Sequence, residues 1–315
     1  MLNKKAIIVW VEWQDGKIMR DKLVLSWYSI VWIWRLRTIY HNFNHNQNID
    51  ILDYMSVSKL IEILRPNEIY YLAAYHHSSQ DQILDDNLLY KRSLGINVEW
   101  YLNFLNAINN IYPETKILYA SSCLIYSSTD TTQQDEFTLH SPNSIYAITK
   151  IQWMHLGNYF YEKYWIKAVN AILYNHESEY RSSKFVSMKI IQWAVNIKKW
   201  LQNSLILWDI NSRVDWWHAR DYVNAMNMLL DNSNIWDYII SSWNLHSIED
   251  MISLVFGYLE LDWKQYVYLD SNIITRKNWI LFGNNSKIIR DTNWAQAFNF
   301  KNMIIDIIEK VIKNV

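Results

Sequence analysis

The chain has 315 residues, half of them apolar, and carries a formal net charge of −1 at pH 7. A chain of this length and apolarity can bury a sizeable core, whereas a charge so close to zero gives no electrostatic case for a nucleic-acid partner. A single cysteine, Cys123, excludes an internal disulfide framework, and no stretch approaches the roughly 18 uncharged apolar residues of a membrane helix. The first residues lead into a strand-like run without signal-peptide features. We therefore expect a soluble, cytoplasmic protein with no membrane partner.

Strand-like runs alternate with helix-like segments along the first half of the chain. This alternation is typical of an α/β fold with a doubly wound parallel Rossmann sheet. We expect residues 1–174 to form a dinucleotide-binding domain. Residues 175–315 should form mainly a smaller, interleaved substrate lobe, with some segments returning to the first domain. The strand-like runs cover residues 5–9, 29–33, 68–72, 116–120 and 167–173.

Binding residues are expected in the loops that follow these strands, because ligands of such sheets sit beyond the carboxyl ends of the strands. The first loop lies within residues 6–23, AIIVWVEWQDGKIMRDKL. A dinucleotide-binding turn needs glycine at three positions, so that the chain turns tightly and its amides approach the pyrophosphate. Only Gly16 fits, because Trp10 and Trp13 stand at the other two positions. As written, these two side chains would occupy the space of the phosphates.

The glycine and tryptophan contents both depart from ordinary usage. The chain has 5 glycines and 18 tryptophans, although a usual glycine content of about 7 % would give roughly 22 glycines. Several tryptophans stand where a turn or a helix end favours a left-handed residue, a conformation that glycine adopts freely and a β-carbon penalises. These are Trp27, Trp165 and Trp243.

We interpret both departures as the result of translating the gene with the wrong meaning for UGA. Some bacterial lineages read this codon as glycine and others as tryptophan. Glycine at 13 of the tryptophan positions, added to the present 5, would bring the glycine count to 18. The alternative is a genuinely tryptophan-rich protein whose indoles pack in the core, which suits one or two positions but not a dozen placed at turns.

Short motifs follow one another in a fixed order: the loop at 10–16, then 50–53 (DILD), 72–74 (LAA), 97–100 (NVEW), 120–122 (ASS), 146–150 (YAITK), 175–178 (NHES) and 215–223 (DWWHARDYV). A Tyr-x-x-x-Lys motif alone is common by chance, but the ordered set is specific. With glycine at the positions above, the chain resembles the extended short-chain dehydrogenase/reductase family of nucleotide-sugar enzymes nearly end to end. Within that family it is similar to the GDP-mannose 4,6-dehydratases. By this comparison Trp216, Trp263 and Trp294 are authentic, and Trp153 and Trp279 are undecided.

The resemblance implies NADP as the cofactor. Arg35, just past the second strand, stands where the family places an arginine against the 2′-phosphate, and an acidic residue there would have favoured NAD. Asp50 and Ile51 correspond to the pair that holds the adenine. The other cofactor-binding positions that the resemblance implies are Trp10, Trp13, Gly16, Leu72, Ala73, Ala74, Tyr146 and Lys150.

The resemblance also implies a catalytic group made of Ser122, Tyr146 and Lys150. A phenol is a poor base at neutral pH. We expect the Lys150 cation one helical turn away, together with the charge of a nicotinamide, to lower the pKa of Tyr146. Ser122 would hydrogen-bond the sugar O4 while Tyr146 takes its proton. A tyrosine and a lysine also share a helix face by chance, but the surrounding motifs argue against that explanation.

Leu124 departs from the family pattern. A 4,6-dehydratase must remove the C5 proton and let O6 leave as water, and the family uses a glutamate two residues after the Ser/Thr for this acid-base work. Leucine cannot transfer a proton, and Cys123 should point to the other face if the strand continues. A 4-keto reductase or an epimerase is therefore an alternative to a dehydratase. A catalytically silent nucleotide-sugar-binding protein is a third possibility, favoured if Trp10 and Trp13 are truly tryptophans.

The remaining implied pocket residues keep the pattern of an enzyme that acts on a nucleotide sugar, with a GDP-hexose as the expected substrate. Candidate contacts to its diphosphate or sugar are Asn175, Lys189, Arg213 and Arg276. His76 and His77 follow the third strand, but no further ligands at suitable spacing indicate a metal site. The resemblance also implies a homo-oligomer, a dimer or a tetramer.

Overall fold

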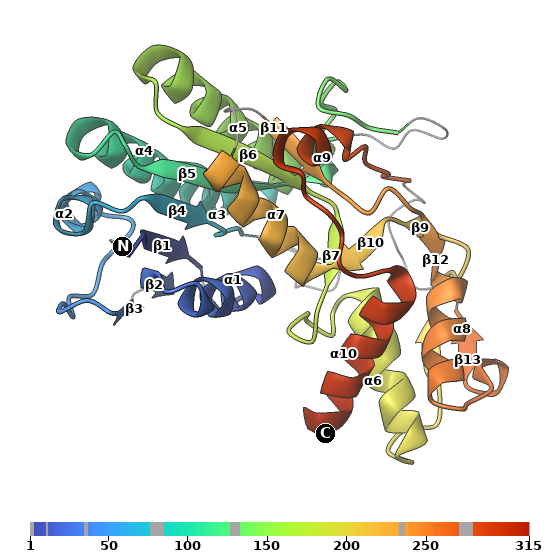
Figure 1. The fold of residues 1–315 in the computed structure, drawn as a ribbon. Coiled ribbons are helices and arrows are strands. Elements are labelled where there is room, and N and C mark those ends of the chain that lie inside the picture. The colour runs from blue at the N-terminus through green and yellow to red at the C-terminus, as the bar shows by residue number, and fades with distance from the viewer. Residues whose placement is uncertain are drawn as a thin grey trace.

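The computed structural model describes residues 3–10, 12–34, 37–75, 85–126, 133–232, 237–270 and 280–314. Within these ranges the chain forms a larger lobe built on one sheet and a smaller lobe that contains the end of the chain (Figure 1). Among the described residues, no helix combines the length and the apolarity needed to cross a bilayer.

A seven-stranded sheet forms the centre of the larger lobe, with the order β11-β6-β5-β4-β1-β2-β3. All neighbouring pairs are parallel except β2 and β3, which pair antiparallel at one edge. The chain runs outward from β1 through β2 and returns on the other side of β1 through β4, so the prediction of a doubly wound sheet is confirmed. The strands are β1 (Lys5–Val9), β2 (Ser29–Trp34), β3 (Arg37–His41), β4 (Glu68–Tyr71), β5 (Lys116–Ser122), β6 (Ala168–Leu173) and β11 (Asp237–Ile240).

Helices cover both faces of this sheet, and every residue of β4 and β6 is buried. Strands enclosed in this way read as continuous apolar runs. On one face α1 contacts α7, and on the other α2 contacts α4, while α3 and α4 contact α5. These helices are α1 (Gln14–Leu25), α2 (Tyr54–Leu64), α3 (Asp86–Leu94), α4 (Trp100–Ile111), α5 (Ile145–Tyr164) and α7 (Ala219–Asn232).

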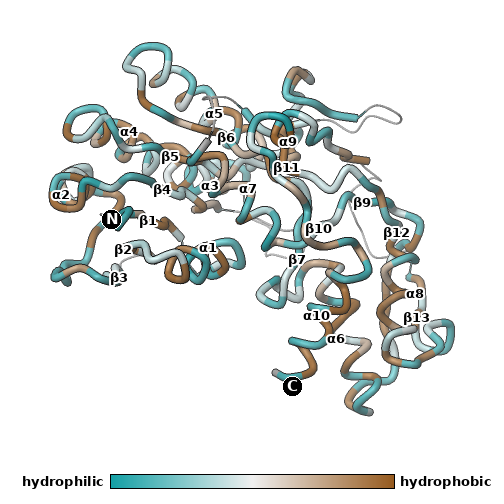
Figure 2. Tube along the Cα trace, viewed as in Figure 1, coloured by the Kyte–Doolittle hydropathy of each residue, from teal (hydrophilic) through white to brown (hydrophobic). Residues whose placement is uncertain are grey.

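The smaller lobe has a hydrophobic core of its own, formed by three helices: α6 (Val186–Lys198), α8 (Ile248–Tyr258) and α10 (Phe300–Asn314). Figure 2 shows apolar stretches along these helices. The core includes Met188, Ile191, Ile252, Met303 and Ile307. Three short strand pairs border it: β7 (Asn175–Glu177) with β10 (Trp216–His218), β8 (Leu205–Leu207) with β13 (Val267–Leu269), and β9 (Arg213–Val214) with β12 (His246–Ser247).

One late segment packs on the larger lobe instead. Helix α9 (Ser286–Thr292) contacts α7 and β11, although it follows the strands of the smaller lobe in sequence. The chain therefore crosses between the two lobes more than once, and the space between them is bordered by residues that are distant in sequence.

Candidate functional site

A pocket of about 570 Å³ opens beyond the carboxyl ends of β5 and β6, between the two lobes. This volume is within the range of small-molecule sites, roughly 300–1,000 Å³. The pocket brings together many residues expected from the sequence: Trp13, Leu72, Ala74, Ser122, Tyr146, Lys150, Asn175 and Lys189. Within the described residues its lining leaves out Trp10, Gly16, Asp50, Ile51, Ala73 and Arg213, whereas Arg35 and Arg276 lie outside the described residues, as do His76 and His77.

Ser122, Tyr146 and Lys150 all line this pocket. Ser122 is the last residue of β5, and the other two lie one turn apart on α5. Lys150 Nζ donates a hydrogen bond to the carbonyl of Ala120 (2.6 Å) and lies 5.4 Å from the centre of the Tyr146 ring. The fold therefore gathers a hydroxyl, a phenol and an amine at the carboxyl end of one central strand.

Burial dominates the protonation of this group. It raises the pKa of Tyr146, although a hydrogen bond with Ser122 and the charge of Arg181 act in the opposite direction. It also lowers the pKa of Lys150, which is fully buried, well below the ordinary value of 10.5. Among the chain's own groups, desolvation of the Tyr146 phenol has the largest effect on its pKa. The lowering expected from Lys150 together with a nicotinamide stays a prediction.

Asn97 holds the helix that carries Tyr146 and Lys150. It is buried within the π-helical turn Gly95–Glu99. Its side-chain amide donates to Thr149 Oγ1 (2.8 Å), and its side-chain oxygen accepts from the amide of Tyr75 (2.9 Å). Asn97 thereby joins α5 to the loop after β4. The motif at 97–100 marks this segment, but the sequence alone assigned no role to the asparagine.

Leu124 and Cys123 both line the pocket directly after Ser122. The strand stops at Ser122 and gives way to the 3₁₀ turn Cys123–Ile125, in which Ser122 Oγ accepts a hydrogen bond from the Leu124 amide (3.3 Å). The expectation that Cys123 points to the other face depended on a continuing strand, and because the strand ends at Ser122 it does not apply. Burial raises the pKa of Cys123 to about 12, so this side chain remains a neutral thiol.

The start of α1 is tied to β7 by side chains that the sequence did not mark as site residues. Gln14 Nε2 donates to the carbonyl of His176 (2.8 Å), and Ser178 Oγ donates to Gln14 Oε1 (2.9 Å). His176 Nε2 lies 3.0 Å from Asp15 Oδ2. These contacts hold the first loop of the sheet against the wall of the pocket that the smaller lobe supplies. The NHES motif was the available signal, although its partners on α1 could not be read from it.

His176 also contacts the residue before β7. Its Nδ1 lies 2.7 Å from the carbonyl oxygen of Tyr174, and since a carbonyl only accepts, this ring nitrogen is the donor. Both His176 and Asp15 line the pocket, and Asp15 Oδ1 is buried with no partner among the described residues. The pair thus places polar groups in the pocket wall at the start of α1.

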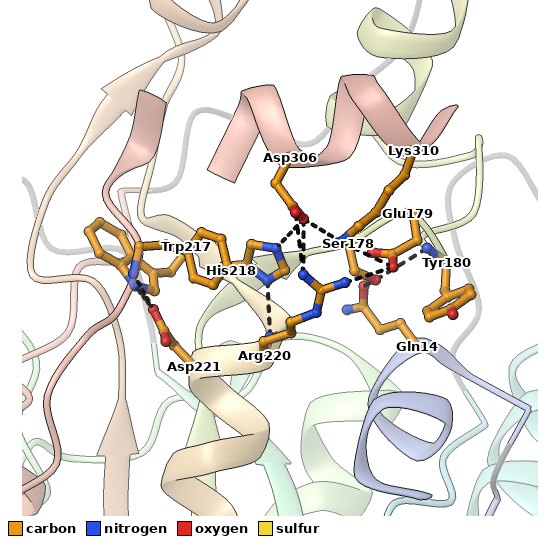
Figure 3. Close-up of polar contacts among 11 residues, drawn as sticks. Gln14, Ser178, Glu179, Tyr180, Trp217, His218, Arg220, Asp221, Asp306 and Lys310 are labelled. Carbon is orange, nitrogen blue, oxygen red and sulfur yellow. Dashed lines mark hydrogen bonds and ion pairs between the residues drawn. The ribbon is translucent and has the colours of Figure 1, made fainter. Parts of the chain in front are cut away.

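A second polar cluster joins the last helix of the smaller lobe to the start of α7 (Figure 3). Asp306 on α10 contacts His218 Nε2 (2.9 Å) and Arg220 Nη1 (3.2 Å) at the start of α7. Arg220 also donates to Glu179 (3.0 Å), and Lys310 lies 3.4 Å from the same carboxylate. Glu179 directly follows Ser178, which contacts Gln14. The cluster therefore connects α10, α7 and the segment that holds the first loop.

The remaining expected residues take varied positions. Lys189 Nζ donates to the carbonyl of Ile206 (2.9 Å) at the pocket, and burial lowers its pKa. Arg213 is exposed on β9. Asp50 accepts a hydrogen bond from the Leu52 amide (2.9 Å) in the turn before α2. In the part of the chain that the structure describes, no group of three or more His, Cys, Asp or Glu side chains is arranged to hold a metal ion.

Asp215 gives the protein a specific pH dependence of stability. Burial raises its pKa from 3.8 to about 7, against hydrogen bonds from the amides of Ser242 (2.8 Å) and Gly283 (3.4 Å). The folded protein therefore binds this proton more tightly than the unfolded chain. The contribution of Asp215 to stability is fully present below the unfolded value of 3.8 and is lost as the pH rises to about 7.

We compare the free energy of unfolding of the unsubstituted protein with that of the Asp215→Asn variant. The difference should fall by up to roughly 4 kcal/mol as the pH rises from 3.8 to about 7. Asparagine keeps the size of the side chain and an acceptor for one of the two amides, and it does not titrate. Urea unfolding of both proteins at several pH values measures the difference. A difference that does not change with pH would show that Asp215 titrates normally.

Comparison with known proteins places these features in one family. The family model for GDP-mannose 4,6 dehydratase matches residues 14–307. GDP-mannose 4,6 dehydratase 2 of Arabidopsis thaliana is 29 % identical over 328 residues, covering 96 % of this chain and 85 % of the relative. GDP-mannose 4,6 dehydratase of Dictyostelium discoideum is 27 % identical over 350 residues, covering 99 % and 96 %.

Solved structures show the same fold at lower identity. RMD from Pseudomonas aeruginosa, complexed with NADPH, superimposes with a TM-score of 0.83 at 18 % identity, covering 99 % of this chain and all of that one. The dTDP-glucose 4,6-dehydratase of Bacillus anthracis, in complex with NAD, gives a TM-score of 0.81 at 17 % identity, covering 99 % and 97 %. The match of the family model over almost the whole chain shows that the protein belongs to the GDP-mannose 4,6 dehydratase family, enzymes of the short-chain dehydrogenase/reductase superfamily.

Proposed function

We propose that the protein modifies a nucleotide-linked hexose by NADP-dependent redox chemistry at C4, most like the 4,6-dehydration of GDP-mannose to GDP-4-keto-6-deoxymannose. The convergence of Ser122, Tyr146 and Lys150 on one pocket carries this proposal. Oxidation of a secondary alcohol needs a group that takes the hydroxyl proton and a neighbour that orients the oxygen. Family membership and the names of the relatives support the GDP-linked substrate.

The residues of the chain have distinct tasks in this proposal. Tyr146 takes the proton of O4, Ser122 hydrogen-bonds O4, and Lys150 supports the phenolate from the next helical turn. A nicotinamide beside them would supply the hydride acceptor for C4. Tyr146 is partly exposed and lines the pocket, and the hydrogen bond with Ser122 offsets part of the rise in its pKa that burial causes.

The catalytic side chains of the site suit a bound cofactor, whereas the loop after β1 does not. The catalytic side chains and the contacts from Gln14 and Asp15 to β7 suit a dinucleotide lying across the carboxyl end of the sheet. The bound NADPH in the structure of RMD supports NADP as the cofactor. Trp10, however, stands in the turn after β1 with its indole buried, where the backbone of a dinucleotide loop must meet the pyrophosphate. As written, the loop does not fit the cofactor.

Basic side chains on the smaller lobe support a diphosphate-containing substrate. Arg181, Lys184 and Lys189 line the same pocket as Asn175. Arg181 lies 3.3 Å from Glu177 and over the Phe185 ring at 3.5 Å, so its guanidinium is held in place. We propose Asn175 and Lys189 as contacts to the diphosphate or sugar, with Arg213 and Arg276 as further candidates.

A second candidate, a 4-keto reductase or an epimerase, is favoured by Leu124. This side chain lines the pocket two residues after Ser122, where an elimination would need an acid-base group. Asp15 contacts His176, and Glu177 contacts both Arg181 and Ser187. Because these partners hold both carboxylates, neither is a simple replacement for the acid-base group that is absent at position 124. A reductase would use the same three catalytic side chains without the elimination.

The proposal is tested by product analysis. With NADP and GDP-mannose, the protein should form a product lighter than GDP-mannose by one water, observed by mass spectrometry. If the protein is a reductase, it should instead reduce the 4-keto-6-deoxy sugar when NADPH is supplied. Inertness toward both sugars, in protein shown to bind NADP, would contradict the proposal.

Leu124→Glu is expected to raise the rate of dehydration by about 10²–10⁴-fold, the usual contribution of a positioned acid-base group. Leu124→Gln is the matched control, because glutamine is polar and has nearly the shape of glutamate but carries no carboxylate. The rate of water loss from GDP-mannose measures the effect. Equal rates in the two variants would show that the absent carboxylate does not limit the reaction, and would favour the second candidate.

A further inference from the structure

We infer that the functional protein carries glycine, not tryptophan, at the left-handed positions of its backbone, and that glycine at position 10 opens the dinucleotide-binding loop. The first part stands on the backbone geometry alone. The second part rests on the proposed function, since it assigns the opened loop to the pyrophosphate of NADP.

The backbone angles single out tryptophan. Among the described residues, nine that are not glycine have φ in the left-handed region, and none of the glycines does. Asparagine, at positions 42 and 293, tolerates this conformation, and Arg65 and Glu260 are two further exceptions. The other five are all tryptophans: Trp10 (78°), Trp27 (63°), Trp165 (60°), Trp200 (60°) and Trp243 (65°). Trp27, Trp165 and Trp243 are the three positions expected from sequence to favour a left-handed residue.

Two of these tryptophans close helices with the bonding pattern that favours glycine. After α1, the amide of Trp27 bonds to the carbonyl of Val24 (3.1 Å) and that of Tyr28 to Leu23 (3.0 Å). After α6, the amide of Trp200 bonds to Ile197 (3.0 Å) and that of Leu201 to Asn196 (2.8 Å). This pair of bonds is the Schellman motif, whose left-handed residue is usually glycine because a β-carbon is disfavoured there.

Packing does not offset the strain at four of the five positions. The side chains of Trp27, Trp165, Trp200 and Trp243 are 79 %, 73 %, 88 % and 43 % exposed. Large exposed indoles contribute little burial, and the turns and helix ends where these four stand are places where glycine is common in other proteins. A codon read as glycine in one genetic code and as tryptophan in another accounts for all four at once.

Trp10 is the left-handed tryptophan that is buried, and it affects the site. It follows β1, and its ring lies 4.8 Å from that of Trp34 at the end of β2 and 6.0 Å from that of Trp100 at the start of α4. The indole nitrogens of Trp10 and Trp100 are buried without a partner among the described residues. These rings gather at the carboxyl edge of the sheet, where a dinucleotide would lie. Glycine at position 10 removes the buried ring from the loop between β1 and α1, where the amides at the start of α1 would meet the pyrophosphate.

The geometry does not mark every tryptophan in this way. Trp13 precedes α1 with φ of −82°, an ordinary extended angle. The indole nitrogens of Trp217 and Trp294 both donate hydrogen bonds to Asp221, through its carboxylate (2.7 Å) and its carbonyl (3.1 Å) respectively. The family resemblance marks Trp294 as authentic but places glycine at 217, so Trp294, which is fully buried and bonded, serves as the internal control for an authentic tryptophan.

Peptide mass spectrometry of protein from its native source tests the first part. We expect glycine masses at positions 10, 27, 165, 200 and 243 and a tryptophan mass at position 294. Tryptophan masses at the five positions would overturn the inference. Because the masses report residue identity, this result does not depend on whether the protein binds NADP.

NADP binding tests the second part, in a chain with glycine at all thirteen positions: 10, 13, 27, 32, 34, 100, 165, 193, 200, 208, 217, 236 and 243. This chain is compared with a second one that has glycine at the other twelve positions and keeps tryptophan at position 10. We expect the Kd for NADP to be at least about 100-fold lower with glycine at position 10, because the ring denies the pyrophosphate its backbone amides. Equal affinity of the two chains would overturn the role of position 10. Absence of binding in both, with glycine masses confirmed, would leave the residue identities standing and refute the proposed NADP function.

Discussion

Tyr146→Phe is expected to lower kcat by about 10²–10⁴-fold or more, the usual contribution of general acid-base catalysis. The substitution removes only the hydroxyl that takes the O4 proton. The ring remains, so its packing beside Lys150 (5.4 Å from Nζ to the ring centre) and its place on α5 should be kept. Steady-state turnover with GDP-mannose, in the glycine-bearing chain, measures the effect.

Tyr101→Phe is the matched control for this variant. Tyr101 is a fully buried tyrosine whose ring packs on Tyr71 and Trp153 in the core, and its hydroxyl has no partner among the described residues. Its loss should leave turnover unchanged. Full turnover in Tyr146→Phe would end the redox proposal, and a similar loss in both variants would indicate damage to the fold.

Glycine at the four exposed left-handed positions, 27, 165, 200 and 243, is expected to raise the free energy of unfolding by roughly 2–4 kcal/mol in sum. A left-handed residue with a β-carbon costs about 1–2 kcal/mol, whereas glycine costs roughly 0.5–1 kcal/mol through the greater entropy of the unfolded chain. The difference is a modest gain at each site. Urea unfolding of the two chains measures it.

Trp294→Gly should have the opposite sign in the same assay. Trp294 is 1 % exposed, and its indole nitrogen donates to the carbonyl of Asp221. Removing such a side chain leaves a cavity and should destabilise the protein by about 3–5 kcal/mol. If the four glycines also destabilised the fold, the left-handed angles would not carry the strain that we assign to them.

The central sheet could be predicted because its strands are covered on both faces and read as apolar runs. The edge strand β3 was not predicted, since its five residues, RTIYH, are short and half polar, and its antiparallel pairing with β2 depends on the neighbouring strand. The two- and three-residue strands of the smaller lobe give even less local signal. Their pairing is decided by how segments far apart in sequence meet.

The site, like the fold, combines features that are local in sequence with features that depend on distant residues. The spacing of Tyr146 and Lys150 on one helix is local, so a motif captures it. The bond between Asp15 and His176 joins residues 161 positions apart, and no spacing rule predicts it. The rise that burial causes in the pKa of Tyr146 could not be predicted either, because the neighbouring charge is visible in the sequence but the depth of burial is not. Left-handed turns and helix ends, by contrast, are local features, and the sequence predicts them at three tryptophans that have positive φ in the structure.

The most direct test of the proposed chemistry uses GDP-mannose labelled with deuterium at C4. The glycine-bearing protein is incubated with NADP and this substrate, and the products are examined by NMR. If Ser122, Tyr146 and Lys150 promote redox chemistry at C4 in a dehydration, deuterium should leave C4 and appear at C6 of a 4-keto-6-deoxy product. Recovery of unchanged GDP-mannose with all its deuterium at C4, from protein that binds NADP, would contradict the account.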